Sequence, residues 1–154
     1  MNFRQKWGMF FATGCYIGKS SFAPGTLGSI LGLPFCFLLS KIDLPVAILG
    51  TVIFIFFAIW IAQGAERQLN IKDPGCIVID EIAGISVALL GLPFNFAFVI
   101  AGFVLFRFFD ILKPFPIRYL EKKFKGGVGI VLDDVAAGIF SNFIIRVGVL
   151  LMNS

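Results

Sequence analysis

Long apolar runs alternate with short polar connections along this chain. The five runs are Leu27–Ser40, Leu44–Ala62, Ile82–Leu92, Phe94–Phe109 and Val135–Met152. They show no strand-like alternation, and lipid offers no partners to backbone polar groups, so each run is predicted to be a helix. A straight crossing takes about 20 apolar residues. Two runs approach that length, and the three shorter ones are expected to tilt, to thin the bilayer or to re-enter.

Composition places the chain in the membrane class. Hydrophobic residues make up 58% of it, charged residues only 14%, and the mean hydropathy is +0.96. A soluble domain carries about 25% charged residues. No linker, internal repeat or low-complexity tract interrupts the sequence. We therefore expect residues 1–154 to form a single all-α domain, a multi-pass integral membrane helical bundle with about five membrane-embedded helices.

Acidic and basic side chains gather on one face of the predicted bundle. Passing the chain back and forth through the five runs places eight of its nine carboxylates there and leaves only Asp43 on the other face. Eleven of the thirteen lysines and arginines share the acidic face. Because basic residues near span ends are retained in the cytoplasm, we expect this face and the N-terminus to be cytoplasmic and the C-terminus to lie outside. Arg146 falls inside the last run, where an unpaired charge costs at least about 2.5 kcal/mol, so it needs a partner or a cavity.

Two acidic pairs are predicted to stand at helix starts. Asp80-Glu81 and Asp133-Asp134 each directly precede an apolar run. A carboxylate at a helix start caps free N–H groups and suits the positive end of the helix dipole. Capping therefore accounts for one acid of each pair and leaves the second unexplained.

Asp110 stands at the other kind of helix end. It follows the Phe94–Phe109 run, where its charge meets the negative end of the dipole. An ion pair with Arg107 is the structural alternative, and such a pair contributes only about 0.2–0.5 kcal/mol on an exposed helix. The helix dipole thus disfavours an acid at this position, and a weak ion pair offsets little of that cost.

Taken together, the five acids predict a metal site. Asp80, Glu81, Asp110, Asp133 and Asp134 would repel one another at a low-dielectric boundary unless a cation lay among them. The chain has no histidine and its three cysteines are scattered, so the ligands would be oxygens, which suit Mg²⁺, Mn²⁺ or Ca²⁺. Mg²⁺ keeps coordination positions open for phosphate oxygens. We predict that these five residues bind Mg²⁺ and catalyse a metal-assisted attack on a phosphoester, with water or an aspartate as the nucleophile.

Three basic residues are candidates for binding a phosphate. Lys113 and Arg118 flank a proline-rich turn that cannot continue the preceding helix. Lys19 belongs to the flexible Gly14–Ser29 segment, whose backbone N–H groups could also meet a phosphate at a helix start. Snorkelling to the membrane surface is the alternative role of the first two cations. Glu121 stands among lysines and is interpreted as a solvated counter-charge.

Four sequence blocks resemble the bacterial phosphatidylglycerophosphatase A family. They are Gly18–Ser29 (GKSSFAPGTLGS), Asp73–Glu81 (DPGCIVIDE), Phe106–Arg118 (FRFFDILKPFPIR) and Gly126–Gly138 (GGVGIVLDDVAAG). Two positions depart from the family pattern: Ile79 replaces an aromatic residue and Lys72 a frequent histidine. The resemblance implies an integral membrane, Mg²⁺-dependent phosphatase that converts phosphatidylglycerophosphate to phosphatidylglycerol and inorganic phosphate. It implies a phospholipid partner, no nucleic acid, and a place in the bacterial inner membrane.

Two other classes of function stay open at this point. A small cation or phosphate transporter would hold its ionisable residues near the middle of the membrane, where the sequence places only Arg146. A structural membrane protein would need neither Asp110 nor doubled acid pairs. The lipid phosphatase instead requires acids and bases to converge at the level of the headgroups.

Overall fold

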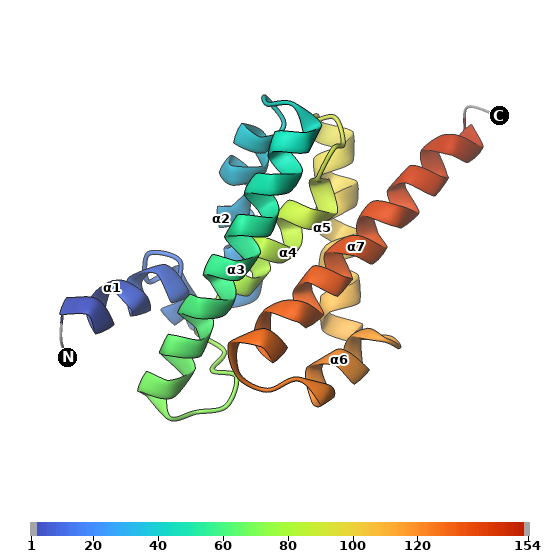
Figure 1. Cartoon of the computed structure of the whole chain (residues 1–154). Coiled ribbons are helices and arrows are strands. Elements are labelled where there is room, and N and C mark those ends of the chain that lie inside the picture. Colours follow the sequence, from blue (N-terminus) through green and yellow to red (C-terminus); the bar gives the residue numbers. More distant parts are fainter. Residues whose placement is uncertain (1–2, 153–154) are drawn as a thin grey trace.

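The computed structural model describes residues 3–152, which fold into a bundle of helices without a strand (Figure 1). In chain order the elements are α1 (Phe3–Ala12), the 3₁₀ turn η1 (Ile17–Lys19), α2 (Pro24–Leu39), α3 (Leu44–Leu69), α4 (Ile79–Leu89), α5 (Phe96–Leu112), α6 (Ile117–Lys123) and α7 (Gly126–Met152). The predicted all-α class is therefore confirmed for this part of the chain. Each of the five apolar runs forms one helix, namely α2, α3, α4, α5 and α7.

Helices α3 and α7 are the two helices among residues 3–152 that are long and apolar enough to cross a membrane. Helix α2 is a shorter apolar helix. Large apolar side chains cover the outward surface of the long helices; Trp60 on α3 is 71% exposed and Phe143 on α7 is 65% exposed. Exposed apolar surface of this extent is unfavourable in water and suits contact with lipid.

The short helix α4 is the centre of the bundle and contacts α2, α3, α5 and α7. All residues from Ala83 to Leu89 are buried. This segment includes Gly84, Ser86 and Ala88, and such small side chains let neighbouring helices approach closely. The hydroxyl of Ser86 donates to the carbonyl oxygen of Ala83 at 2.7 Å, so its burial leaves no unpaired donor.

Two glycines set the distance between α4 and α7. A Cβ atom on Gly138 would collide with the carbonyl oxygen of Gly84 and would lie 3.0 Å from the Cβ of Val87. A Cβ atom on Gly84 would collide with the ring of Phe106 and would lie 2.9 Å from the carbonyl oxygen of Asp134. Close backbone contact at this crossing therefore brings the acids of α4 and α7 together.

Helix α7 starts earlier than predicted, at Gly126 instead of Val135. Its first turn is stabilised by a side chain from α3, because the Gly127 N–H donates to Gln63 Oε1 at 3.0 Å. A Cβ atom on Gly127 would collide with the carbonyl oxygen of Ile59, so the glycine-rich start also permits close packing on α3. Tertiary contact thus overrides the low helix propensity of glycine.

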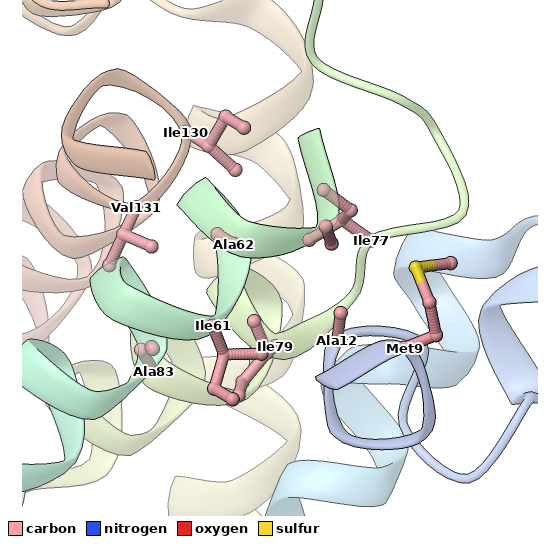
Figure 2. Close-up of a cluster of buried hydrophobic side chains, with 11 residues drawn as sticks. Met9, Ala12, Ile61, Ala62, Ile77, Ile79, Ala83, Ile130 and Val131 are labelled. Carbon is pink, nitrogen blue, oxygen red and sulfur yellow. The ribbon is translucent and has the colours of Figure 1, made fainter. Parts of the chain in front are cut away.

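A cluster of buried apolar side chains joins α1, α3, α4 and α7 close to the acids (Figure 2). Ile79 directly precedes Asp80 and is 2% exposed, while Val131 lies two residues before Asp133 and is fully buried. The connection into α4 is also fixed by the backbone, since the Val78 N–H donates to the carbonyl oxygen of Ala12 at 2.8 Å. This packing anchors both acid-bearing segments.

Arg146 has the partner that its position requires. Its Nε donates to Asn142 Oδ1 at 2.7 Å, and one of its Nη atoms donates to the carbonyl oxygen of Leu90 at 3.0 Å. Asn142 Nδ2 in turn lies within hydrogen-bond distance of three carbonyl oxygens at the C-terminal end of α4, those of Val87, Ala88 and Leu90. The two side chains of α7 thus cap α4, whose last carbonyls have no partner within the helix.

The crossing of α4 and α7 gives a first testable prediction. Gly138→Ala should destabilise the protein by about 1–3 kcal/mol, because the added methyl group meets backbone atoms of α4 that cannot move aside. Gly148→Ala on the same helix is the matched control, since a Cβ atom there has nothing within 4 Å. Thermal unfolding in detergent measures both changes. Equal stability of the two variants would show that the crossing is not tightly packed.

Candidate active site

Carboxylates from two helices converge at one end of the bundle. Asp80 and Glu81 lie in the first turn of α4, and Asp134 lies inside α7. One oxygen of each of the three carboxylates can be chosen so that all three lie within 4.8 Å of one another. Asp80 is 8% exposed and Asp134 is 3% exposed. This spacing and burial match a set of ligands around one small cation.

The two acid pairs reach this cluster in different ways. Asp80 and Glu81 stand at a helix start, close to where the sequence places them, and their charges suit the positive end of the α4 dipole. The expectation that Asp133 and Asp134 precede a helix is wrong, because α7 begins at Gly126 and encloses them. Helix capping therefore explains neither acid of this second pair.

Asp110 forms the ion pair with Arg107 that the sequence suggested as its structural role. The pair is largely sheltered: the Arg107 side chain is 17% exposed and that of Asp110 is 12% exposed. It also borders the cluster, because a Cβ atom on Gly25 would collide with Glu81 Oε1 and would lie 3.0 Å from both Arg107 Nη atoms. Gly25, in the first turn of α2, thus allows that turn to reach Glu81 and Arg107 together.

Lys113 connects the cluster to the surface. Its Nζ lies 2.6 Å from Asp133 Oδ2 and 3.2 Å from Glu121 Oε1. Helix α5 ends directly before Lys113, which adopts a left-handed conformation with φ 44° and turns the chain away from the helix. Burial alone would lower the pKa of Lys113, but its hydrogen bonds with Asp133 and Glu121 outweigh that effect and raise the pKa. Glu121, whose side chain is 37% exposed, is therefore a counter-charge whose partner is Lys113.

Several buried oxygens at this site have no hydrogen-bond partner. They are Asp80 Oδ1, Glu81 Oε2, Asp133 Oδ1 and Asp134 Oδ2. Unpaired buried carboxylates are costly, and a bound cation is the usual compensation.

The predicted phosphate-binding residues are placed unequally. Lys113 and Arg118 line one open cleft of about 500 Å³, and Lys113 also pairs with Glu121 on α6. Lys19 is exposed, and its Nζ lies 4.7 Å from the centre of the Tyr16 ring rather than against a carboxylate. The structure thus brings Lys113 to the acids, places Arg118 at the adjacent surface and leaves Lys19 outside the cluster.

The comparison with known proteins agrees with this geometry. A family model described as phosphatidylglycerophosphatase A matches residues 10–149. The chain belongs to the phosphatidylglycerophosphatase A family. No solved structure matches it significantly.

Three curated relatives are similar to this phosphatidylglycerophosphatase A family member over most of its length. The phosphatidylglycerophosphatase A of Escherichia coli is 36% identical over 131 residues, which are 84% of this chain and 76% of the relative. That of Haemophilus influenzae is 38% identical over 125 residues, 80% of this chain and 77% of the relative. A Bacteroides thetaiotaomicron protein, provisionally named a phosphatidylinositol-3-phosphatase, is 41% identical over 152 residues, 90% of this chain and 91% of the relative. The family is one of phosphatases, and the two membrane-capable helices agree with a membrane protein.

Arg107 is the site residue that sequence reasoning undervalued. Sequence reasoning treats it only as a structural partner of Asp110, yet its guanidinium lies next to Glu81 against Gly25 of α2, and its buried Nε has no hydrogen-bond partner within residues 3–152. The available signal was an arginine within the apolar α5 segment, where a charge needs a specific reason.

The crowding of acids gives a second testable prediction. In protein stripped of metal ions, Asp134→Asn should raise the midpoint of thermal unfolding by about 2–4 °C or more, because it removes a buried charge beside Asp80 and Glu81. Asp43→Asn, an exposed change at the start of α3, should leave the midpoint unaltered. A lower midpoint for Asp134→Asn would mean that this carboxylate is already compensated within the protein.

Proposed function

We propose that this protein catalyses the Mg²⁺-dependent hydrolysis of phosphatidylglycerophosphate to phosphatidylglycerol and inorganic phosphate, a step of phospholipid biosynthesis. The observation that carries the proposal is the convergence of Asp80, Glu81 and Asp134, with unpaired buried oxygens, in a member of this phosphatase family. One water molecule is consumed, the terminal P–O bond to the glycerol is broken, and the lipid keeps its diester phosphate.

The donor set fits a magnesium ion. Asp80, Glu81 and Asp134 would hold it, since their oxygens lie within 4.8 Å of one another and the site contains only hard oxygen ligands. When bound, Mg²⁺ supplies positive charge to the oxygens of the transferred phosphoryl group. Asp110 and Asp133 are each paired with a cation of the protein and so belong to the catalytic cluster as partners of Arg107 and Lys113.

The protein's own cations bind and orient the phosphate in this proposal. Arg107 is held by Asp110 and Lys113 by Asp133, which fixes both cationic side chains before the substrate arrives. Such preorganised charge stabilises the charge that develops in the transition state without reorganisation at the moment of reaction. Arg118 contributes from the cleft, and Lys19 contributes from the loop before α2 once the headgroup is bound.

The location of the site supports an enzyme that works on lipid headgroups. Figure 1 shows α6 at one end of the bundle and the C-terminal end of α7 at the opposite end. Asp80 and Glu81 lie in the first turn of α4, and Asp133 pairs with Lys113 directly after the end of α5. These acids therefore lie near helix ends, whereas a transporter would hold them near mid-membrane. In this proposal the five helices α2, α3, α4, α5 and α7 are embedded in the bacterial inner membrane. The acidic end faces the cytoplasm, as the distribution of lysines and arginines favours.

The test is release of inorganic phosphate from phosphatidylglycerophosphate by the purified protein in mixed micelles, with and without Mg²⁺. We expect turnover that disappears on chelation and returns with Mg²⁺. Asp80→Asn, Glu81→Gln and Asp134→Asn should each reduce kcat at least about 100-fold, because each removes a negative ligand with little change in shape. A parallel assay with phosphatidylinositol 3-phosphate separates the two activities named among the relatives.

Glu66→Gln is the control for this experiment. Glu66 is an acid at the same end of the bundle whose side chain accepts from the Asp73 N–H at 3.4 Å, outside the metal-ligand group. Its turnover should stay within about twofold of the wild type. Near-normal Mg²⁺-dependent turnover in folded Asp80→Asn and Asp134→Asn proteins would contradict the mechanism, and preference for phosphatidylinositol 3-phosphate would contradict the substrate.

A further inference from the structure

The cleft beside the acids is rich in cationic side chains. Its lining, called here the α6 cleft, consists of Leu112, Lys113, Pro114, Phe115, Arg118, Tyr119 and Lys122. Three of these seven side chains are cationic, whereas lysine and arginine make up 13 of the 154 residues of the whole chain. Lys122 was not among the residues that the sequence singled out.

The arrangement of α6 directs two of these cations to one place. Arg118 and Lys122 are four residues apart on the same helix, so they lie on one face of it and both line the cleft. Lys123 is not part of the lining: its Nζ lies 5.4 Å from the centre of the ring of Tyr119, which borders the cleft, and 5.8 Å from that of Phe124. Neighbouring lysines on one helix thus differ in whether they line the cleft.

The cleft combines a link to the acids with exposed apolar side chains. Lys113 lines the cleft and also pairs with Asp133. Two apolar lining residues are strongly exposed, Phe115 at 83% and Leu112 at 54%. A ligand suited to this lining would therefore carry negative charge next to an apolar part.

We propose that the α6 cleft binds the phosphodiester group of the lipid substrate, with Arg118 and Lys122 as its ligands, while Lys113 marks the boundary with the terminal phosphate. The inference rests on the proposed function, because phosphatidylglycerophosphate carries two phosphates separated by one glycerol and only the terminal one is removed. The diester is the phosphate that joins the acyl-bearing glycerol, and the cleft offers exposed apolar side chains together with its cations. Recognition of this second phosphate distinguishes the substrate from lipids with a single phosphate.

The cleft residues should therefore contribute to binding more than to the chemical step. Lys122→Gln and Arg118→Gln should each raise KM for phosphatidylglycerophosphate about fivefold, with kcat lowered less than about twofold. Phosphatidylglycerol retains the diester, so its inhibition constant should rise by the same factor. Inorganic phosphate has neither diester nor lipid, and its inhibition constant should stay the same. Lys123→Gln is the matched control for net charge and should change none of these quantities.

A binding measurement keeps this inference separate from the proposed function. Native mass spectrometry of the full chain in detergent compares retention of phosphatidylglycerol and of diacylglycerol, which lacks the phosphodiester, by the wild type, Lys122→Gln and Lys123→Gln. Selective loss of phosphatidylglycerol from Lys122→Gln supports the cleft even if the wild type fails to hydrolyse phosphatidylglycerophosphate, which would refute the proposed function alone. Equal effects of Lys122→Gln and Lys123→Gln, or no effect of either, would show that the lysines act only as general surface charge and would overturn the inference.

Discussion

Burial of several like charges at the meeting point of two helices is the constraint on which this structure depends. Asp80, Glu81 and Asp134 come together because α4 and α7 cross with backbone contact at Gly84 and Gly138. Carboxylates in such a position repel one another and lack water, so an apolar bundle gains nothing from them by itself. The same feature becomes favourable when a divalent cation and an anionic phosphate occupy the site. The buried acids thus lower the stability of the free protein at the place where the proposed chemistry needs them.

The rest of the fold holds these acids in place. Buried apolar residues lie next to the acids, with Ile79 before Asp80 and Val131 near Asp133. At the C-terminal end of α4, Asn142 and Arg146 donate to the carbonyl oxygen of Leu90. Around the cluster, Arg107 and Lys113 are each paired with an acid, so the cations are positioned before any ligand binds. Rigid placement of charge is what electrostatic catalysis requires.

The local sequence pattern predicts most of the helices and several of the site acids. Apolar runs located the five helices α2, α3, α4, α5 and α7, and unpaired helix-end charges drew attention to Asp80, Glu81 and Asp110. The start of α7 was missed because Gly127 bonds to Gln63, a residue 64 positions earlier. The partner of Glu121 is not predictable from the local sequence, because Lys113 precedes α6 across a turn. In each case the missing information was a contact between segments that no local pattern contains.

The central claim, that buried carboxylates form a site for one divalent cation, is tested most directly by metal binding itself. Electron paramagnetic resonance titration of Mn²⁺ into the metal-free protein measures binding without reference to turnover. The account predicts a saturable site that Mg²⁺ competes for, whose affinity falls at least about tenfold in Asp80→Asn and in Asp134→Asn and is unchanged in Asp43→Asn. Mn²⁺ binding of equal affinity in the wild type and both acid variants would contradict it.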